Sequence, residues 1–136
     1  MTNLLQVKDL AVGFQSMSGM INAVNGVSFR VRPGSVVALV GESGSGKSVT
    51  AHAILGILPR QGRILAGSIL FYDPGNGGGV IDLARLDPSS ASFRALRGKR
   101  MAMIFQEPMT SLSPLHTVGD QVSEALTIHG RISRKE

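Results

Sequence analysis

The stretch GESGSGKS, residues 41–48, constrains the fold of this chain more than any other feature. It fits the spacing G-x-x-x-x-G-K-[ST], in which glycines let successive backbone N–H groups turn inward around a phosphate. An apolar run, VVALV at 36–40, precedes the motif, and KSVTAHAILGIL at 47–58 follows it. We expect the first run to be a strand buried on both faces and the second to be a helix ending before Pro59.

The residue types predict distinct roles within this loop. Lys47 has the reach to contact the β- and γ-phosphates of a nucleoside triphosphate, and the Ser48 hydroxyl can ligate Mg²⁺. The helix N-terminus adds further unsatisfied donors and its dipole. A dinucleotide fingerprint is excluded, because Val49 stands where its last glycine is required. The predicted nucleotide-binding set is Gly41, Ser43, Gly44, Ser45, Gly46, Lys47, Ser48, Val49 and Thr50, the last two near the α-phosphate.

The remaining pattern predicts an α/β fold with a partly parallel sheet. Strands are expected at 4–14, 21–31, 67–72 and 101–106, with a turn at 32–35 and a hairpin-like insertion at 73–79. Helices are expected at 88–98, with Pro and Ser capping signals, and from Thr117 onward.

Composition and net charge limit the kinds of molecule that we expect this chain to bind. The chain has 136 residues with 43% hydrophobic residues, enough for one domain with a real core, and it has no cysteine for disulfides or thiolate metal sites. The net charge of +5 favours anionic partners. The basic residues gather at 94–100 and 131–135, and no aromatic residues interleave with them to stack on bases, so nucleic-acid binding is not expected. Neither a signal peptide nor an apolar run of membrane-spanning length is present in the sequence.

A second informative stretch is MAMIFQEPMTSLSP, residues 101–114. Its apolar strand would deliver Gln106 to the point where a loop begins. A neutral amide there can ligate Mg²⁺ or orient a water molecule through its oxygen. A polar residue at a strand-to-loop boundary is also a common structural feature, so the residue type alone leaves both interpretations open.

The sequence resembles the ATP-binding subunits of ABC transporters, most closely the oligopeptide/dipeptide (and nickel) importer subfamily. The resemblance spans most of residues 4–126 and rests on AVNGVSFRVRPGSVVALVGESGSGKSVTAHAILGIL, GSILF and RGKRMAMIFQEPMTSLSPLHTVGDQVSEAL. It implies a P-loop NTPase (RecA-like) core with an N-terminal antiparallel β region, incomplete here. On this basis 1–35 would be the β region, 36–106 the core up to the Q-loop, and 107–136 the start of the helical subdomain.

The resemblance also implies roles for individual residues. Gly41 to Ser48 correspond to the Walker A loop, and Gln106 to the Q-loop glutamine that senses Mg²⁺ and the γ-phosphate, so Lys47 and Gln106 are the expected catalytic residues and Ser48 and Gln106 the expected metal ligands. Phe14 corresponds to an aromatic that stacks on adenine, although it could equally be a core residue. The implied cofactors are ATP and Mg²⁺.

The implied partners are transmembrane permease subunits, a second ATPase subunit in a head-to-tail dimer and, indirectly, a solute-binding protein. The implied location is peripheral, at the cytoplasmic face of the cell (inner) membrane. Import of peptides or similar small solutes is the implied process.

Several parts of the family's machinery do not occur before Glu136. These are an LSGGQ-like signature, an apolar strand ending in Asp-Glu, and a switch histidine. Glu107 follows an apolar strand, but Gln106 stands where the Mg²⁺-holding aspartate should be, so Glu107 is a poor general base. We therefore expect this chain to be the N-terminal part of a longer ATPase, binding ATP but turning it over negligibly.

Two other interpretations remain open from the residues. A complete small P-loop kinase would use the arginines between Arg94 and Arg100 as a lid, and a non-catalytic module would keep the loop as an anion site. An incomplete core has a further physical consequence: uncovered apolar surface, with marginal stability or self-association.

Overall fold

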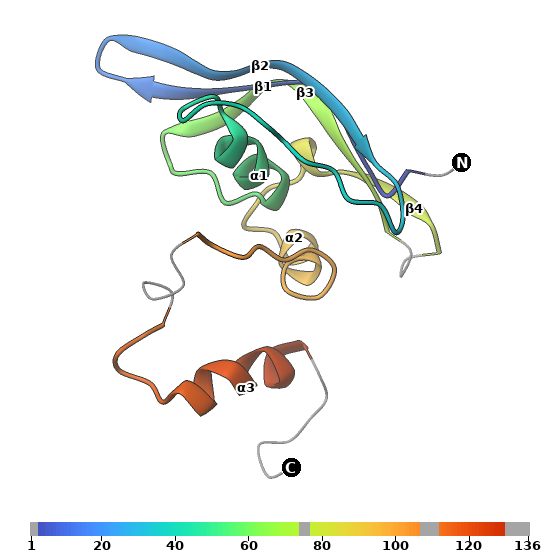
Figure 1. Ribbon diagram of the computed structural model, residues 1–136, viewed down its shortest axis with the longest axis vertical. Coiled ribbons are helices and arrows are strands. Elements are labelled where there is room, and N and C mark those ends of the chain that lie inside the picture. Colours follow the sequence, from blue (N-terminus) through green and yellow to red (C-terminus); the bar gives the residue numbers. More distant parts are fainter. Residues whose placement is uncertain (1–2, 74–76, 107–111, 130–136) are drawn as a thin grey trace. The chain divides into compact units, whose positions relative to one another are not determined.

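The structure, a computed structural model, describes residues 3–73, 77–106 and 112–129 and divides into two units, Met1–Arg94 and Ala95–Glu136 (Figure 1). Its elements in chain order are β1 (Leu5–Ser16), β2 (Gly19–Val31), α1 (Lys47–Leu55), β3 (Gly62–Asp73), β4 (Gly79–Asp82), the 3₁₀ helix η1 (Leu83–Arg85), α2 (Ala91–Leu96) and α3 (Val118–His129).

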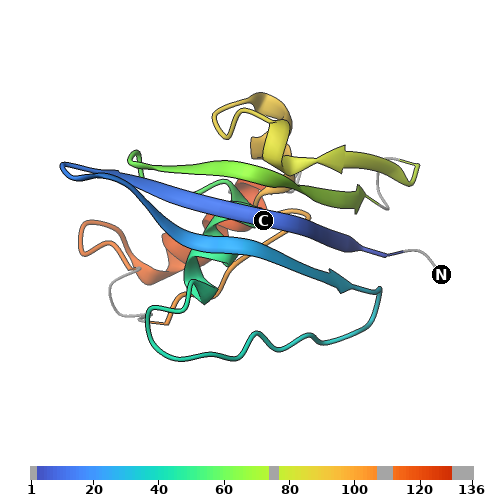
Figure 2. The same cartoon turned by 90° about the horizontal axis from the view of Figure 1, so that it is seen from above.

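The first unit is built on an antiparallel sheet with the strand order β2-β1-β3-β4, seen from above in Figure 2. The β1–β2 hairpin confirms the strands predicted at 4–14 and 21–31. The strand predicted at 67–72 is also confirmed, but β3 begins earlier, at Gly62, because the first part of it pairs with the far end of β1. The antiparallel β3–β4 pair is the hairpin predicted around 73–79, whose residues 74–76 lie outside the described part of the chain.

The core of this unit lies between one face of the sheet and α1 (Figure 1). Its side chains are aliphatic or phenylalanine, as the low aromatic content requires, and each such side chain contributes about 1.5–3 kcal/mol when fully buried. The buried set of this unit is Val7, Leu10, Val12, Val24, Ala53, Leu55, Ile69, Phe71, Leu83 and Phe93.

Helix α1 ends at Leu55, earlier than the predicted end at residue 58. The cause is Gly56, which takes the left-handed conformation with φ 61°. The Gly56 N–H donates to Ala53 O at 3.2 Å and the Ile57 N–H donates to His52 O at 2.9 Å, a glycine C-cap that satisfies two terminal carbonyls.

Two predicted strands are not formed, and those two predictions are wrong. Residues 36–40 have no regular structure, and Val36 and Val40 are 97% and 92% exposed. In 101–106 only Met101 forms a bridge, an isolated one with Arg97, and Ile104 and Phe105 are exposed. A strand that is buried on both faces lies inside a sheet, with hydrogen-bonded strands along both of its edges. Within the described residues neither segment has them, and the sheet is antiparallel rather than partly parallel. The exposure of these apolar side chains confirms the expectation that part of the apolar surface is uncovered.

Both predicted C-terminal helices are present, with their caps. The Ser90 hydroxyl accepts a hydrogen bond from Phe93 N–H at 3.1 Å at the start of α2, and the Thr117 hydroxyl accepts one from Asp120 N–H at 3.1 Å at the start of α3. The Gln121 side chain on α3 accepts from Ser113 N–H at 2.8 Å and donates to Ser113 O at 3.0 Å, which fixes the preceding loop to the helix. Among the described helices, none has the length and apolar character needed to cross a membrane.

Candidate functional site

The glycine loop is anchored at its end to strand β2. Gly46 has φ 91°, and a Cβ at this position would lie 2.6 Å from Ala23 O and 3.1 Å from Val24 Cγ2. Both the backbone conformation and the close approach to β2 therefore require glycine. This contact places the start of α1 on the hairpin. Sequence reasoning missed Ala23, because nothing in a strand residue's type reveals which loop it will support.

The N-terminus of α1 presents backbone donors without a side-chain cap. Gly46 is the N-cap residue, and the first turn contains no acidic side chain. The first N–H groups of a helix have no intrahelical partner, so an uncapped helix start offers them to an anion. The Thr50 amide and hydroxyl are turned inward instead, each donating to Gly46 O at 2.9 Å, and Thr50 is only 3% exposed. Its predicted proximity to the α-phosphate stays a prediction.

The loop curls around the ammonium group of Lys47. Lys47 Nζ donates to Gly41 O at 2.7 Å and to Glu42 O at 2.6 Å, and the third donor reaches the Ser45 hydroxyl at 3.1 Å. Three residues of the predicted nucleotide-binding set, Gly41, Ser45 and Lys47, thus lie in contact with one another, and their binding role stays a prediction. The single positive charge of this segment is held by two carbonyl oxygens and one hydroxyl of its own loop.

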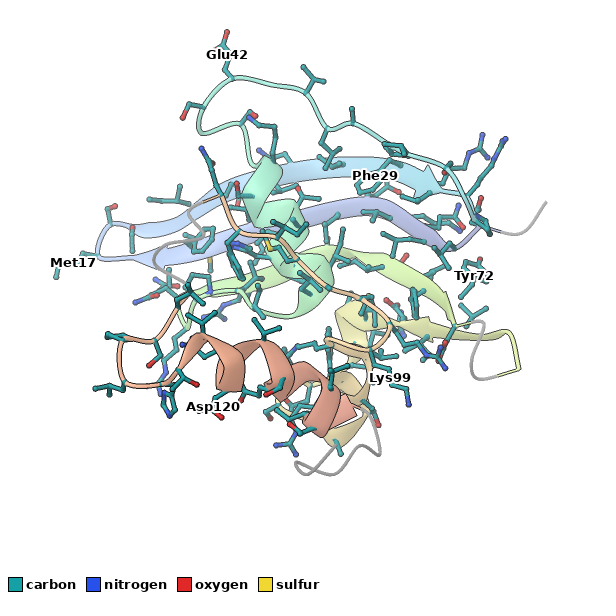
Figure 3. The ribbon with its side chains drawn as sticks, turned by 60° about the horizontal axis from the view of Figure 1, so that its bottom comes forward. Met17, Phe29, Glu42, Tyr72, Lys99 and Asp120 are labelled. Carbon is teal, nitrogen blue, oxygen red and sulfur yellow. The ribbon has the colours of Figure 1, made fainter. Side chains whose placement is uncertain are left out.

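Two glycines of this loop have different surroundings. A Cβ at Gly41 would lie 2.6 Å from Ser45 Oγ, so any side chain there would collide with the loop. Gly44 has φ 80° and no atom within 4 Å of the position of a Cβ, which leaves open space in front of its backbone. Glu42 lies at the outer limit of the loop and its side chain points away from it (Figure 3).

The Ser48 hydroxyl is a possible ligand for an Mg²⁺ ion that is bound together with a nucleotide. Ser43 and Ser48 are exposed, so the Ser48 hydroxyl is accessible as a ligand. In the described ranges no group of three or more histidine, aspartate or glutamate side chains is placed to hold a metal ion. Mg²⁺ bound by Ser48 would therefore need phosphate oxygens and water to complete its shell, as it commonly does in nucleotide sites.

Phe14 lies on β1, paired with Ile21 on one side and Gly62 on the other. Its ring lies against Gly62, whose Cβ would come within 2.8 Å of Phe14 Cε1. The neighbouring Gly13 faces Met20 and Leu65, so strand alternation directs Phe14 to the opposite face of the sheet.

The end of the glycine loop approaches the neighbouring part of this hairpin: Val24, which pairs with Val12 on β1, lies close to Gly46. Phe14 is half-buried, so part of its ring remains accessible. This placement agrees with a base-stacking role and equally with a packing role, so the adenine contact stays a prediction.

Gln106 is exposed and belongs to the second unit. Its predicted approach to Mg²⁺ and the γ-phosphate therefore stays a prediction. Glu107 lies outside the described residues.

A cavity of about 370 Å³ lies elsewhere in the first unit, beside the C-terminal end of α1. Its lining includes Gly56, Ile64, Leu83 and Phe93 and none of the predicted site residues.

Comparison with known proteins identifies the relatives of this chain. The family model described as ABC transporter matches residues 24–135. A probable peptide ABC transporter ATP-binding protein of Sinorhizobium fredii is 47% identical over 98% of this chain and 37% of its own length. The dipeptide transport ATP-binding protein of Bacillus subtilis is 45% identical, with coverages of 99% and 38%. The oligopeptide transport ATP-binding protein of Mycobacterium tuberculosis is 44% identical, with coverages of 99% and 21%. The chain therefore spans well under half the length of these relatives.

Proposed function

Because this chain belongs to the ABC transporter family of ATP-binding proteins, we propose that it binds ATP through residues 41–48 and forms part of an ATPase that powers uptake of peptides or similar small solutes. The observation that carries this proposal is the uncapped N-terminus of α1, which follows the glycine loop and has Lys47 as its first residue. The relatives named for peptide transport support the class of solute.

The chemistry of the site is positioning and charge neutralisation. The Lys47 ammonium binds oxygens of the β- and γ-phosphates, and backbone N–H groups of the loop and of the first turn of α1 hold the same oxygens. Such preorganised donors stabilise the charge that spreads over the γ-phosphoryl oxygens during transfer. Bound Mg²⁺ would supply positive charge that neutralises part of the phosphate charge. Ser48 would hold it.

Two further contacts complete the proposed site. Phe14, on β1, stacks on the adenine base. Gln106 reaches Mg²⁺ and the γ-phosphate and connects them to the surface that contacts the permease. Residues 1–35 form the β region, 36–106 the core and 107–136 the beginning of the helical subdomain.

We place the protein at the cytoplasmic face of the membrane, as a peripheral subunit bound to transmembrane permease subunits and paired head to tail with a second ATPase subunit. A solute-binding protein delivers the cargo to the permease. The 136 residues contain neither an LSGGQ-like signature nor an apolar strand ending in Asp-Glu. We therefore expect the chain to bind the phosphates of ATP but to lack a general base. Its rate of ATP hydrolysis is expected to stay at the background level.

The test is titration calorimetry with Mg²⁺ and ATP on the chain, its Lys47→Ala variant and, as a control, its Lys99→Ala variant. Lys47→Ala removes a charge-assisted contact and is expected to weaken ATP binding about 10-fold to 100-fold. Lys99 is an exposed lysine after α2 and its loss is expected to change affinity less than about twofold. Equal affinities of the wild-type and Lys47→Ala chains would overturn the proposal and favour adventitious anion binding.

A further inference from the structure

The hydrogen bonds of Lys47 are saturated within its own loop. A lysine ammonium has three donors and no acceptor. In this structure the three are taken by Gly41 O, Glu42 O and Ser45 Oγ. Phosphate oxygens can therefore bind the ammonium only by replacing one of these loop acceptors. The affinity of the loop for phosphate is then a competition between internal and external acceptors.

Ser45 is the acceptor that is replaced most easily. Its hydroxyl lies 3.1 Å from Lys47 Nζ, whereas the carbonyl oxygens of Gly41 and Glu42 lie at 2.7 and 2.6 Å. The two carbonyls are part of the backbone, whereas the hydroxyl can turn away by rotation about one side-chain bond. Among the three acceptors, Ser45 Oγ is also the only one that a substitution can remove without changing the backbone.

The position of the Ser45 hydroxyl is itself fixed by the loop. The Ser45 N–H donates to Glu42 O at 3.2 Å, which closes the turn, and the hydroxyl lies directly over Gly41, 2.6 Å from where a Cβ would be. The turn and the bare face of Gly41 together hold Ser45 Oγ beside the ammonium. Gly41 thus allows a lysine–serine contact that no other residue at position 41 would allow.

We propose that Ser45 is a positioning residue that holds Lys47 in a retracted position and competes with nucleotide phosphate for the Lys47 ammonium. The inference rests on the proposed function, in that the competing ligand is a nucleotide. It assigns the Ser45 hydroxyl a role that opposes binding, while the Ser45 backbone remains part of the phosphate-binding loop.

The first experiment compares nucleotide affinities of the wild-type chain with those of Ser45→Ala and Ser45→Thr. Ser45→Ala is expected to tighten ATP and ADP about 3-fold to 10-fold, the factor that corresponds to one exposed hydrogen bond. AMP has no β-phosphate to reach Lys47, so its affinity is expected to stay unchanged. Ser45→Thr keeps the hydroxyl and is expected to restore the affinities of the wild-type chain. Unchanged or weaker ATP binding by Ser45→Ala would overturn the proposal.

A double variant separates the competition from a structural effect. In a Lys47→Ala background the Ser45 hydroxyl has no ammonium to hold. Ser45→Ala is then expected to change ATP affinity less than about 1.5-fold, well below the effect of losing one hydrogen bond. If Ser45→Ala tightens ATP to the same extent in both backgrounds, the effect does not pass through Lys47 and the proposal fails.

The second experiment needs no nucleotide. Competitive labelling with acetic anhydride gives the reactivity of Lys47 relative to the exposed Lys8 and Lys99 as internal references. Ser45→Ala is expected to raise the relative rate at Lys47 about 2-fold to 5-fold, because the side chain loses one of the contacts that hold it in the loop and reaches the reagent more often. An unchanged rate would overturn the role of Ser45 even if ATP binds. Conversely, a wild-type chain that binds no ATP would refute the proposed function, while labelling would still decide whether Ser45 holds Lys47.

Discussion

Gly56 lies directly against the ring of Phe93: a Cβ at position 56 would come within 2.6 Å of Phe93 Cζ. Gly56 also has φ 61°, a conformation that L-residues with a side chain rarely adopt. The end of α1 is therefore held to the core by a residue without a side chain.

Replacement of Gly56 by alanine is expected to lower the free energy of unfolding by about 2–4 kcal/mol, because backbone strain and overpacking add. Gly34→Ala is the matched control, since Gly34 has φ 70° but no atom within 4 Å of its Cβ position. It is expected to cost about 1 kcal/mol, the conformational part alone. Urea unfolding measures both values, and equal losses would show that contact with Phe93 contributes nothing.

Asp82, at the end of β4, connects this strand to β3 and η1 through its carboxylate. Its Oδ1 accepts from Ile69 N–H at 3.0 Å and from Ala84 N–H at 3.1 Å, and its Oδ2 pairs with Arg85 at 3.2 Å. Asp82→Ala is expected to destabilise the fold by about 2 kcal/mol, because two backbone donors lose their acceptor. Arg85 is 85% exposed, so Arg85→Ala is expected to cost at most about 0.5 kcal/mol. Similar losses in thermal unfolding for the two variants would contradict this ranking.

The pKa of Asp87 lies below its ordinary value of 3.8, first because the Ser89 N–H donates to its carboxylate and then because the Ser89 hydroxyl does. A lowered folded-state pKa means that ionised Asp87 stabilises the fold above pH 3.8 and that this contribution is lost as the pH falls through the folded value. Ser89→Ala keeps the backbone donor, so it is expected to move the pKa only part of the way back. An NMR titration of the Asp87 carboxyl carbon would test this, and a pKa unaffected by Ser89→Ala would refute it.

The apolar side chains of Val36 and Val40 are exposed to solvent, at 97% and 92%, whereas Val12 is fully buried. Val36→Ser and Val40→Ser are therefore expected to change the free energy of unfolding by less than about 0.5 kcal/mol, and Val12→Ser to lower it by about 3 kcal/mol. The two exposed variants should also reduce concentration-dependent association, since they remove an uncovered apolar patch. Analytical ultracentrifugation measures the association, and an unchanged sedimentation profile would show that this patch does not drive it.

The sequence predicted local features well where the residues themselves determine the geometry. The helix predicted after the glycine loop begins at Lys47, and Ser90 and Thr117 marked helix starts because a hydroxyl before a helix satisfies its free N–H groups. The β1–β2 hairpin followed from the alternation of its residues. The family, too, could be inferred from the motifs and is supported by the match over residues 24–135.

Features that depend on residues far apart in the chain were harder to predict from the sequence. The run VVALV has the composition of a buried strand, but a strand exists only if other strands lie beside it, and composition does not state whether they do. The support of Gly46 by Ala23 and the length of β3 likewise depend on contacts far apart in the chain. Gly56 could have been interpreted as a helix end, because glycine after an apolar helical run is a common C-cap.

Both ends of the glycine-loop segment lie beside the same strand. Residue 32 follows the end of β2 at Val31, and Gly46 packs closely against Ala23 within that strand, so the connecting chain begins and ends next to β2. A segment closed in this way has already given up part of its conformational freedom before it meets a ligand. For the proposed phosphate ligand, the entropy left to lose on ordering would be correspondingly smaller, so the β1–β2 hairpin would contribute to affinity by restraining the loop without contacting the phosphate.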